Sequence, residues 1–147
     1  MKTRNIIWIH EDAMRADHPV VFQAGEQAEA VFIWDAAYFE AQGYSAKRLV
    51  FIYECLMDLP VVLYVGETET ALRELVSGGR LFVPTTPNPY FNTILDNLSG
   101  DIDVTQVPDI PLVIAPDDVD LKRFFRFWNK VRKSALTSSE PYQQAAE

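Results

Sequence analysis

Five short apolar runs, separated from one another by helical patterns, restrict this chain to a small set of folds. The runs lie at Ile6–Ile9, Ala30–Trp34, Val61–Val65, Leu81–Pro84 and Asp103–Val107. Such runs are typical of strands in a sheet that is covered on both faces. Strands that alternate with helices form parallel sheets with right-handed crossovers. We therefore predict an α/β fold: a three-layer, Rossmann-like or flavodoxin-like domain with a parallel five-stranded sheet of strand order 3-2-1-4-5 and helices on both faces.

Helix signals fill the intervals between the runs. They predict helices at Pro19–Glu26, Ser45–Leu59, Thr68–Val76 and Pro89–Leu98. Ser45 and Thr68 are the predicted N-caps, because a hydroxyl oxygen accepts a hydrogen bond from an N–H group of the first turn. Gly78 and Gly79 predict the end of the third helix.

A C-terminal helix is predicted to begin at Asp117 and Asp118. Its apolar residues recur at helical spacing and are Leu121, Phe124, Phe125, Trp128 and Val131. A stripe of this kind must pack against another apolar surface. Residues 137–147 have no period, so we predict one domain over residues 1–136 followed by a disordered tail.

Length and composition are those of a single globular domain. The chain has 147 residues, of which 48% are hydrophobic and 23% are charged. No apolar run approaches the roughly 20 residues that span a bilayer, and the apolar run near the N-terminus is shorter than that of a secretory signal. We expect a cytoplasmic protein that does not bind membranes.

The charge of the chain is unevenly distributed. The formal net charge is −8, from 13 basic and 21 acidic side chains, and six of the basic ones lie within residues 122–133. Proteins that bind nucleic acid on their own carry an excess of Lys and Arg that contacts phosphates. We therefore expect no direct binding of nucleic acid, and we interpret the basic window as the solvated face of a helix rather than as a DNA-binding patch.

A candidate site follows from the predicted topology. Open parallel sheets bind ligands beyond the carboxyl ends of their strands, at the point where the strand order reverses. This point lies between the loop at His10–Asp12 and the loop at Thr85–Tyr90, with Trp34 beside them. The candidate cofactor-binding residues are His10, Glu11, Asp12, Trp34, Asp35, Lys47, Arg48, Thr85, Thr86, Asn88 and Tyr90.

The chemistry of these loops allows two interpretations. Trp34 and Tyr90 are candidates to stack on a planar ring, and N–H groups near Pro89 are candidates to bind an anion. In the alternative interpretation, Trp34 belongs to the core and Thr85–Tyr90 is a turn rich in residues that begin helices.

Several segments of the chain follow, in order, the pattern of one known family. They are Trp8 with Asp12 and Asp17-His18-Pro19, Val31–Asp35, the Arg-x-x-Phe-Ile-x-Glu-x-Leu core of Ser45–Leu59, Leu63–Glu67, Asn88-Pro89-Tyr90 and Phe124–Trp128. Over residues 5–135 the chain therefore resembles the N-terminal α/β domain of the DNA photolyase/cryptochrome family.

The resemblance implies a domain that can hold an antenna chromophore: a folate, a deazaflavin or a flavin mononucleotide. FAD is not expected, because the family binds it in a helical domain that follows the matched region, and we expect no photolyase activity from this chain alone. Two departures concern the site. His10 and Met14 stand where the family has arginines, and Thr86 and Asn88 stand where it has acidic residues.

Other catalytic chemistry has little support in the sequence. His10 and His18 are the only histidines and Cys55 is the only cysteine, so we predict no metal site and an inert thiol. The chain has no glycine-rich phosphate loop and no nucleophile elbow. His10, Asp12 and Asp17 form a conceivable acid/base cluster, although carboxylates at this kind of junction are more often helix caps.

Three functions therefore stay open. The first is a module that binds a chromophore or a nucleotide. The second is an interaction domain without a ligand, whose partner is a second copy of the chain or a separate protein. The third is a small enzyme that uses the His10 cluster. The first two differ in whether Trp34, Lys47, Arg48 and Tyr90 line a cavity or a flat surface.

Overall fold

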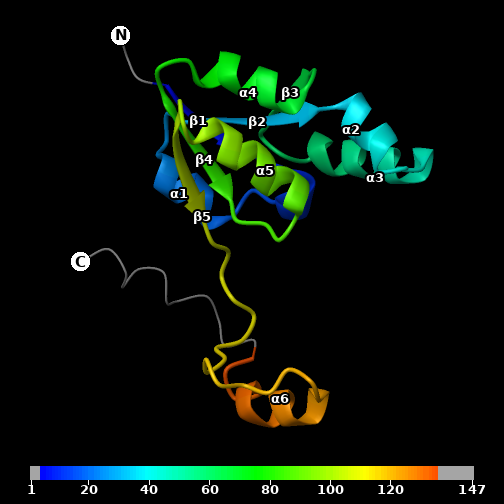
Figure 1. The fold of residues 1–147 in the computed structure, drawn as a ribbon, viewed down its shortest axis with the longest axis vertical. Coiled ribbons are helices and arrows are strands. Elements are labelled where there is room, and N and C mark those ends of the chain that lie inside the picture. The colour runs from blue at the N-terminus through cyan, green and yellow to red at the C-terminus, as the bar shows by residue number, and fades with distance from the viewer. Residues whose placement is uncertain (1–3, 136–147) are drawn as a thin grey trace. The chain divides into compact units, whose positions relative to one another are not determined.

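The computed structural model describes residues 4–135, which Figure 1 shows as a coloured ribbon. The chain divides after Asp109 into two units, of which the first holds the sheet and the second holds the last helix. The tail predicted at residues 137–147 lies outside the described residues, and the single domain over residues 1–136 stays a prediction.

The sheet has the predicted topology. Its strands are β1 (Asn5–Trp8), β2 (Glu29–Trp34), β3 (Val62–Val65), β4 (Arg80–Pro84) and β5 (Asp103–Val107). All neighbouring strands are parallel, and their order is β3-β2-β1-β4-β5. The predicted α/β fold class is therefore confirmed, and the reversal of strand order lies at β1, between β2 and β4.

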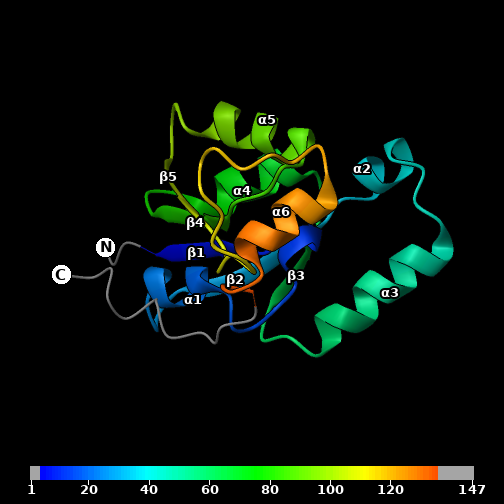
Figure 2. The same cartoon turned by 90° about the horizontal axis from the view of Figure 1, so that it is seen from below.

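Helices lie on both faces of this sheet. They are α1 (Pro19–Ala24), α2 (Ala36–Ala41), α3 (Ala46–Met57), α4 (Thr68–Val76) and α5 (Pro89–Leu98), and a short 3-10 helix covers Glu11–Ala13. Figure 2 shows α4 and α5 over one face and α1 over the other, while α2 and α3 extend to one side. Each predicted helix of this unit is present, and α2 is one that the sequence patterns did not predict.

Alternation along β1 divides the core between the two faces. Ile6 and Trp8 pack with the apolar residues of α4 and α5, which form the larger core cluster. Ile7 and Ile9 point to the opposite face and pack with residues of α1. Successive side chains of a strand point to opposite faces, so one apolar run supplies both cores.

The ends of two helices follow the predicted capping chemistry in part. The Ser45 hydroxyl accepts a hydrogen bond from the N–H of Arg48 at 3.3 Å, as predicted. The predicted cap at Thr68 is wrong, because Thr68 is the first residue of α4 and the Glu67 carboxylate accepts from the N–H groups of Glu69 and Thr70, at 3.1 and 2.8 Å. A carboxylate is a good cap because it also faces the positive end of the helix dipole.

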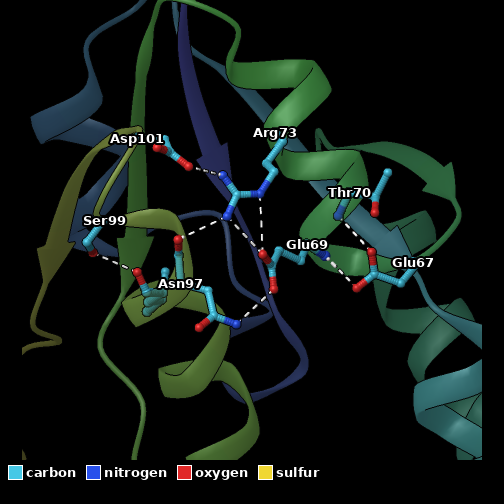
Figure 3. Close-up of polar contacts among 8 residues, drawn as sticks. Glu67, Glu69, Thr70, Arg73, Asn97, Ser99 and Asp101 are labelled. Carbon is cyan, nitrogen blue, oxygen red and sulfur yellow. Dashed lines mark hydrogen bonds and ion pairs between the residues drawn. The ribbon is translucent and has the colours of Figure 1, made fainter.

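Figure 3 shows this cap together with the contacts that join α4 to α5. Arg73 donates to the Glu69 carboxylate at 2.9 Å, to the Asp101 carboxylate at 2.6 Å and to the Asn97 carbonyl at 3.0 Å. Past the end of α4, Gly78 has a φ of +74°, and a Cβ on Gly79 would collide with the carbonyl oxygen of Arg4. The glycine pair therefore ends the helix as predicted.

The second unit contains α6 (Phe124–Val131), which begins later than predicted. Asp120 accepts a hydrogen bond from the N–H of Lys122 at 2.9 Å, and its other oxygen pairs with Arg126 at 3.2 Å. Such a local side-chain bond favours a turn over a helix, so the acidic residues precede the helix instead of beginning it. Within residues 4–135, no helix is both long and apolar enough to cross a bilayer.

Candidate functional site

The loops that follow β1 and β4 meet at the carboxyl edge of the sheet, as the topology predicts. The Thr86 hydroxyl donates a short hydrogen bond to Asp12, which joins the two loops directly. The Asn88 amide donates to the Tyr38 hydroxyl at 3.2 Å. The ring of Tyr90 stacks on that of Tyr38, with centroids 4.3 Å apart. Side chains from α2 and α5 therefore fill the crevice between the loops.

The buried carboxylate of Glu11 is the centre of this network. One of its oxygens accepts hydrogen bonds from the hydroxyls of Tyr38, at 3.0 Å, and of Tyr44. The other oxygen has no hydrogen bond within the described residues and lies 3.8 Å from the Arg48 guanidinium, which stacks over the Tyr44 ring at 4.0 Å. We call Glu11, Tyr38, Tyr44 and Arg48 the Glu11 cluster.

Electrostatics keep the tyrosines of this edge protonated. Burial, together with the acceptor Glu11, raises the pKa of Tyr38 and of Tyr44 above the usual range. Burial, with the Asp35 carboxylate nearby, raises the pKa of Tyr90 to about 12. A protonated hydroxyl donates a hydrogen bond to Glu11. The cluster is therefore a stable hydrogen-bonded network, and its protonated tyrosines are not nucleophiles.

His10 is also buried at this edge, with 1% of its surface exposed. Its Nε2 lies 2.9 Å from the Pro84 carbonyl oxygen, to which it must donate, and its ring stacks on Phe91 with centroids 5.1 Å apart. Nδ1 then has a lone pair, and no partner for it exists in residues 4–135. Burial lowers the pKa of His10, so the imidazole is neutral near pH 7.

Free space beside His10 is very small. A cavity of about 10 Å³ is bounded by Trp8, His10, Glu11, Tyr38 and Phe91, among others. That volume holds about one water molecule, and water is the natural partner for both His10 Nδ1 and the second oxygen of Glu11. A planar ring does not fit here without displacing side chains.

Asp35 serves the fold at this edge. Its Oδ1 accepts from the N–H of Tyr38 at 3.0 Å and caps α2. Its Oδ2 accepts from both the N–H and the hydroxyl of Thr68, each at 2.9 Å, which holds the start of α4. The predicted ligand residue thus already has three donors on its two oxygens.

Residues of the loop after β4 are engaged in a similar way. Asn88 caps α5 by accepting from the N–H of Tyr90 at 3.0 Å, and the Thr86 hydroxyl accepts from the N–H of Asn88 at 3.0 Å. The N–H of Thr85 donates to the carbonyl of Val107 at 2.9 Å. Two N–H groups beside Pro89, those of Asn88 and Tyr90, therefore already have acceptors within the chain.

Trp34 lies apart from these loops, in a shallow pocket of about 260 Å³. Other residues that line it are Phe39, Glu40, Tyr44 and Leu49. Trp34 makes an edge contact with Phe39, with centroids 4.9 Å apart, and is half-buried. Neither Tyr90 nor the exposed Lys47 is among the residues that line this pocket.

The acid/base cluster is dispersed. His10 and Asp12 use their contacts with Pro84 and Thr86, whereas Asp17 is exposed and pairs with Arg15 at 2.8 Å. The cap of α1 is His18, whose Nδ1 accepts from the N–H of Val20 at 3.1 Å. Among residues 4–135, no group of three or more His, Cys, Asp or Glu side chains has the arrangement of a metal site.

A larger hollow lies on the face of the sheet that carries α1. This apolar groove has a volume of about 560 Å³. Three parts of the chain line it. The strands contribute Ile7, Ile9 and Ala30, and α1 contributes Val21 and Phe22. The connection that leads to β3 contributes Leu59, Pro60 and Val61. Sequence patterns did not predict it, although the pair Val21-Phe22 on a short helix was a possible signal.

Comparison with known proteins leaves the family open. No family model matches this chain, and no curated protein does. The photolyase/cryptochrome resemblance therefore stays a prediction.

Proposed function

We propose that this chain is a photolyase-like α/β domain that works as a protein-binding module and has no catalytic activity of its own. Its partner binds at the apolar groove between α1 and the segment Leu59–Val61. The observation that carries the proposal is the groove itself, the largest hollow described above, which is open and lined mainly by apolar side chains.

Exposure of large apolar side chains around the groove supports this proposal. Phe22 is 80% exposed, and Val21 beside it is 36% exposed. On the adjoining edge strand β3, Leu63 and Val65, which alternate onto the same face as Val61 of the groove, are 38% and 79% exposed. Several large apolar side chains exposed on one face are uncommon on monomers and mark sites of association.

The closed carboxyl edge also favours a protein partner over a ligand at the predicted crevice. There, Asp12 binds Thr86, Glu11 binds two tyrosines, and the cavity measures about 10 Å³. Sites for drug-sized molecules have volumes of about 300–1,000 Å³. A chromophore would have to break several buried hydrogen bonds to enter.

Site-specific cross-linking tests the proposal. A photoreactive phenylalanine analogue placed at Phe22 should give one abundant adduct with a defined protein in the native cell, identified by mass spectrometry. The matched control places the same analogue at Asp96, an exposed position of α5. Equal adducts at both positions, or none at Phe22, would contradict the proposal.

The pocket at Trp34 favours a second candidate function, the binding of a planar chromophore such as a folate, a deazaflavin or flavin mononucleotide. Its aromatic lining and the Arg48–Tyr44 stack suit a flat anionic molecule. Titration with flavin mononucleotide, a deazaflavin and a folate, followed by absorption and tryptophan fluorescence, should give saturable binding that Trp34→Leu abolishes. Spectra that never change would exclude this candidate.

A further inference from the structure

Helix α3 presents charged and apolar residues on its outward side. Five residues at spacings of one or three share one face of the helix: Lys47, Val50, Phe51, Glu54 and Met57. Asp58 continues that face just past the last turn. We call these six residues the outward face of α3. The core side of the helix is formed instead by the buried residues Ile52 and Leu56.

The outward face carries three large apolar side chains that are accessible. Val50 is 55% exposed, Phe51 is 60% exposed and Met57 is 66% exposed. A helix that only covers a core has polar residues on its outer side. Three large apolar side chains in these positions indicate a surface that another protein covers.

The charges on the outward face identify that protein as a second copy of the chain. The positive residue, Lys47, lies at the start of α3, and the negative residues Glu54 and Asp58 lie toward its end. When two copies of α3 run antiparallel with the two-fold axis beside Val50 and Phe51, these apolar residues meet and Lys47 of each copy faces Glu54 of the other. An arrangement that is complementary to itself under a two-fold rotation is the condition for a symmetric dimer.

The acidic body of the chain limits other ways of self-association. Residues 1–109 hold 16 acidic and 7 basic side chains, so this part of the chain repels a second copy of itself unless opposite charges are paired. The antiparallel arrangement of α3 places opposite charges together and also aligns the helix dipoles favourably.

We propose that the chain forms a two-fold dimer in which the outward faces of α3 pair antiparallel. This dimer goes beyond the proposed function, because it uses a surface other than the groove at α1. Six residues per copy are few compared with the roughly 20–30 of a standard interface, so the dimer is weak and reversible, with a dissociation constant in the micromolar range.

Sedimentation equilibrium of the full chain over a wide concentration range tests the dimer. The wild type should change from monomer to dimer, and Phe51→Asp should raise the dissociation constant by at least about tenfold. The matched control is Leu112→Asp, because Leu112 is also exposed but belongs neither to the outward face nor to the groove, and it should leave the dimer unchanged.

Charge reversal tests the antiparallel geometry. Lys47→Glu or Glu54→Lys alone should raise the dissociation constant about three- to tenfold, since the dimer holds each pair twice. The double reversal should restore it to about the wild-type value. Each new charge suits the helix dipole at its end of α3, so circular dichroism should stay unchanged.

The outcomes are decisive for the dimer alone. A wild type that stays monomeric at all concentrations would overturn the dimer. A double reversal whose dissociation constant is as high as those of the single reversals would overturn it as well. Cross-linking at Phe22 to a different protein would survive either result, because it reports on the groove.

Discussion

The two faces of the sheet differ in how completely they are covered. Under α4 and α5, residues such as Leu72, Leu95 and Leu98 are at most 1% exposed and pack against Ile6 and Trp8. Within residues 4–109, the face that carries α1 has a groove of about 560 Å³ beside Ile7 and Ile9. Under the proposed function, stability and association are therefore assigned to opposite faces of one sheet.

The largest loss of stability should come from a substitution on the face under α4 and α5, which we call the closed face. Leu95→Ala removes a side chain that is 1% exposed and should lower the free energy of unfolding by about 2–5 kcal/mol, through lost burial and the cavity left behind. Phe22→Ala, on the open face, should change it by less than about 0.5 kcal/mol. Urea denaturation of both variants measures this contrast, and equal losses would refute the division between faces.

A smaller loss of stability is expected from a substitution at the carboxyl edge of the sheet, where hydrogen bonds join α2 to α4. Asp35→Ala removes the acceptor for three buried donors, those of Tyr38 and Thr68, and should lower the free energy of unfolding by about 2–3 kcal/mol. Asp35→Asn keeps one acceptor and should recover part of that loss. If the alanine variant were as stable as the wild type, Asp35 would have no role in joining α2 to α4.

The buried imidazole of the closed face predicts a dependence on pH. Burial lowers the pKa of His10 below 6.5, its usual value, so the unfolded state binds the proton more strongly. The stabilising effect is complete above pH 6.5 and is lost as the pH falls, with a slope of up to about 1.4 kcal/mol per pH unit. Urea denaturation at several pH values between 7 and 5 measures the free energy of unfolding at each pH. That free energy should change less steeply with pH for His10→Gln than for the wild type. Parallel slopes would show that His10 does not contribute.

The smallest effect should come from the exposed bridge that links α4 to α5 in Figure 3. Arg73→Ala removes the contacts with Glu69 and Asp101, yet solvent screens these charges. The urea midpoint should fall less than in Leu95→Ala or Asp35→Ala, and the difference from the wild type should shrink in 1 M NaCl. A salt-independent loss would indicate that the aliphatic stem of Arg73, not its charge, matters.

Much of the fold could be predicted because its signals are local. Apolar runs such as Ile6–Ile9 identify strands, and their alternation with helices predicts a parallel sheet, for which 3-2-1-4-5 is a common strand order. Helix α2 was missed because Ala36–Ala41 is short and its start depends on the cap at Asp35. The late start of α6 was missed because the side chain of Asp120 competes for the backbone.

The candidate site could be located but its interior could not be predicted. Adjacent loops after β1 and β4 follow from the topology alone. Tyr38 and Tyr44 were missed, although they hold Glu11 and narrow the crevice, because their contacts join residues 27 and 33 positions apart. No periodicity reports such pairings, which only the folded chain creates.

The hydrogen bonds of Asp35 close loops of different lengths, which predicts the order in which they form as the domain folds. Its bond to Tyr38 closes a loop of three residues, whereas its bonds to Thr68 close a loop of 33. Short loops close first, and long ones wait until the intervening chain, here α3 and β3, is in place. We therefore expect the same group to cap α2 early in folding and to bind the start of α4 late, once β3 has joined β2 and β1.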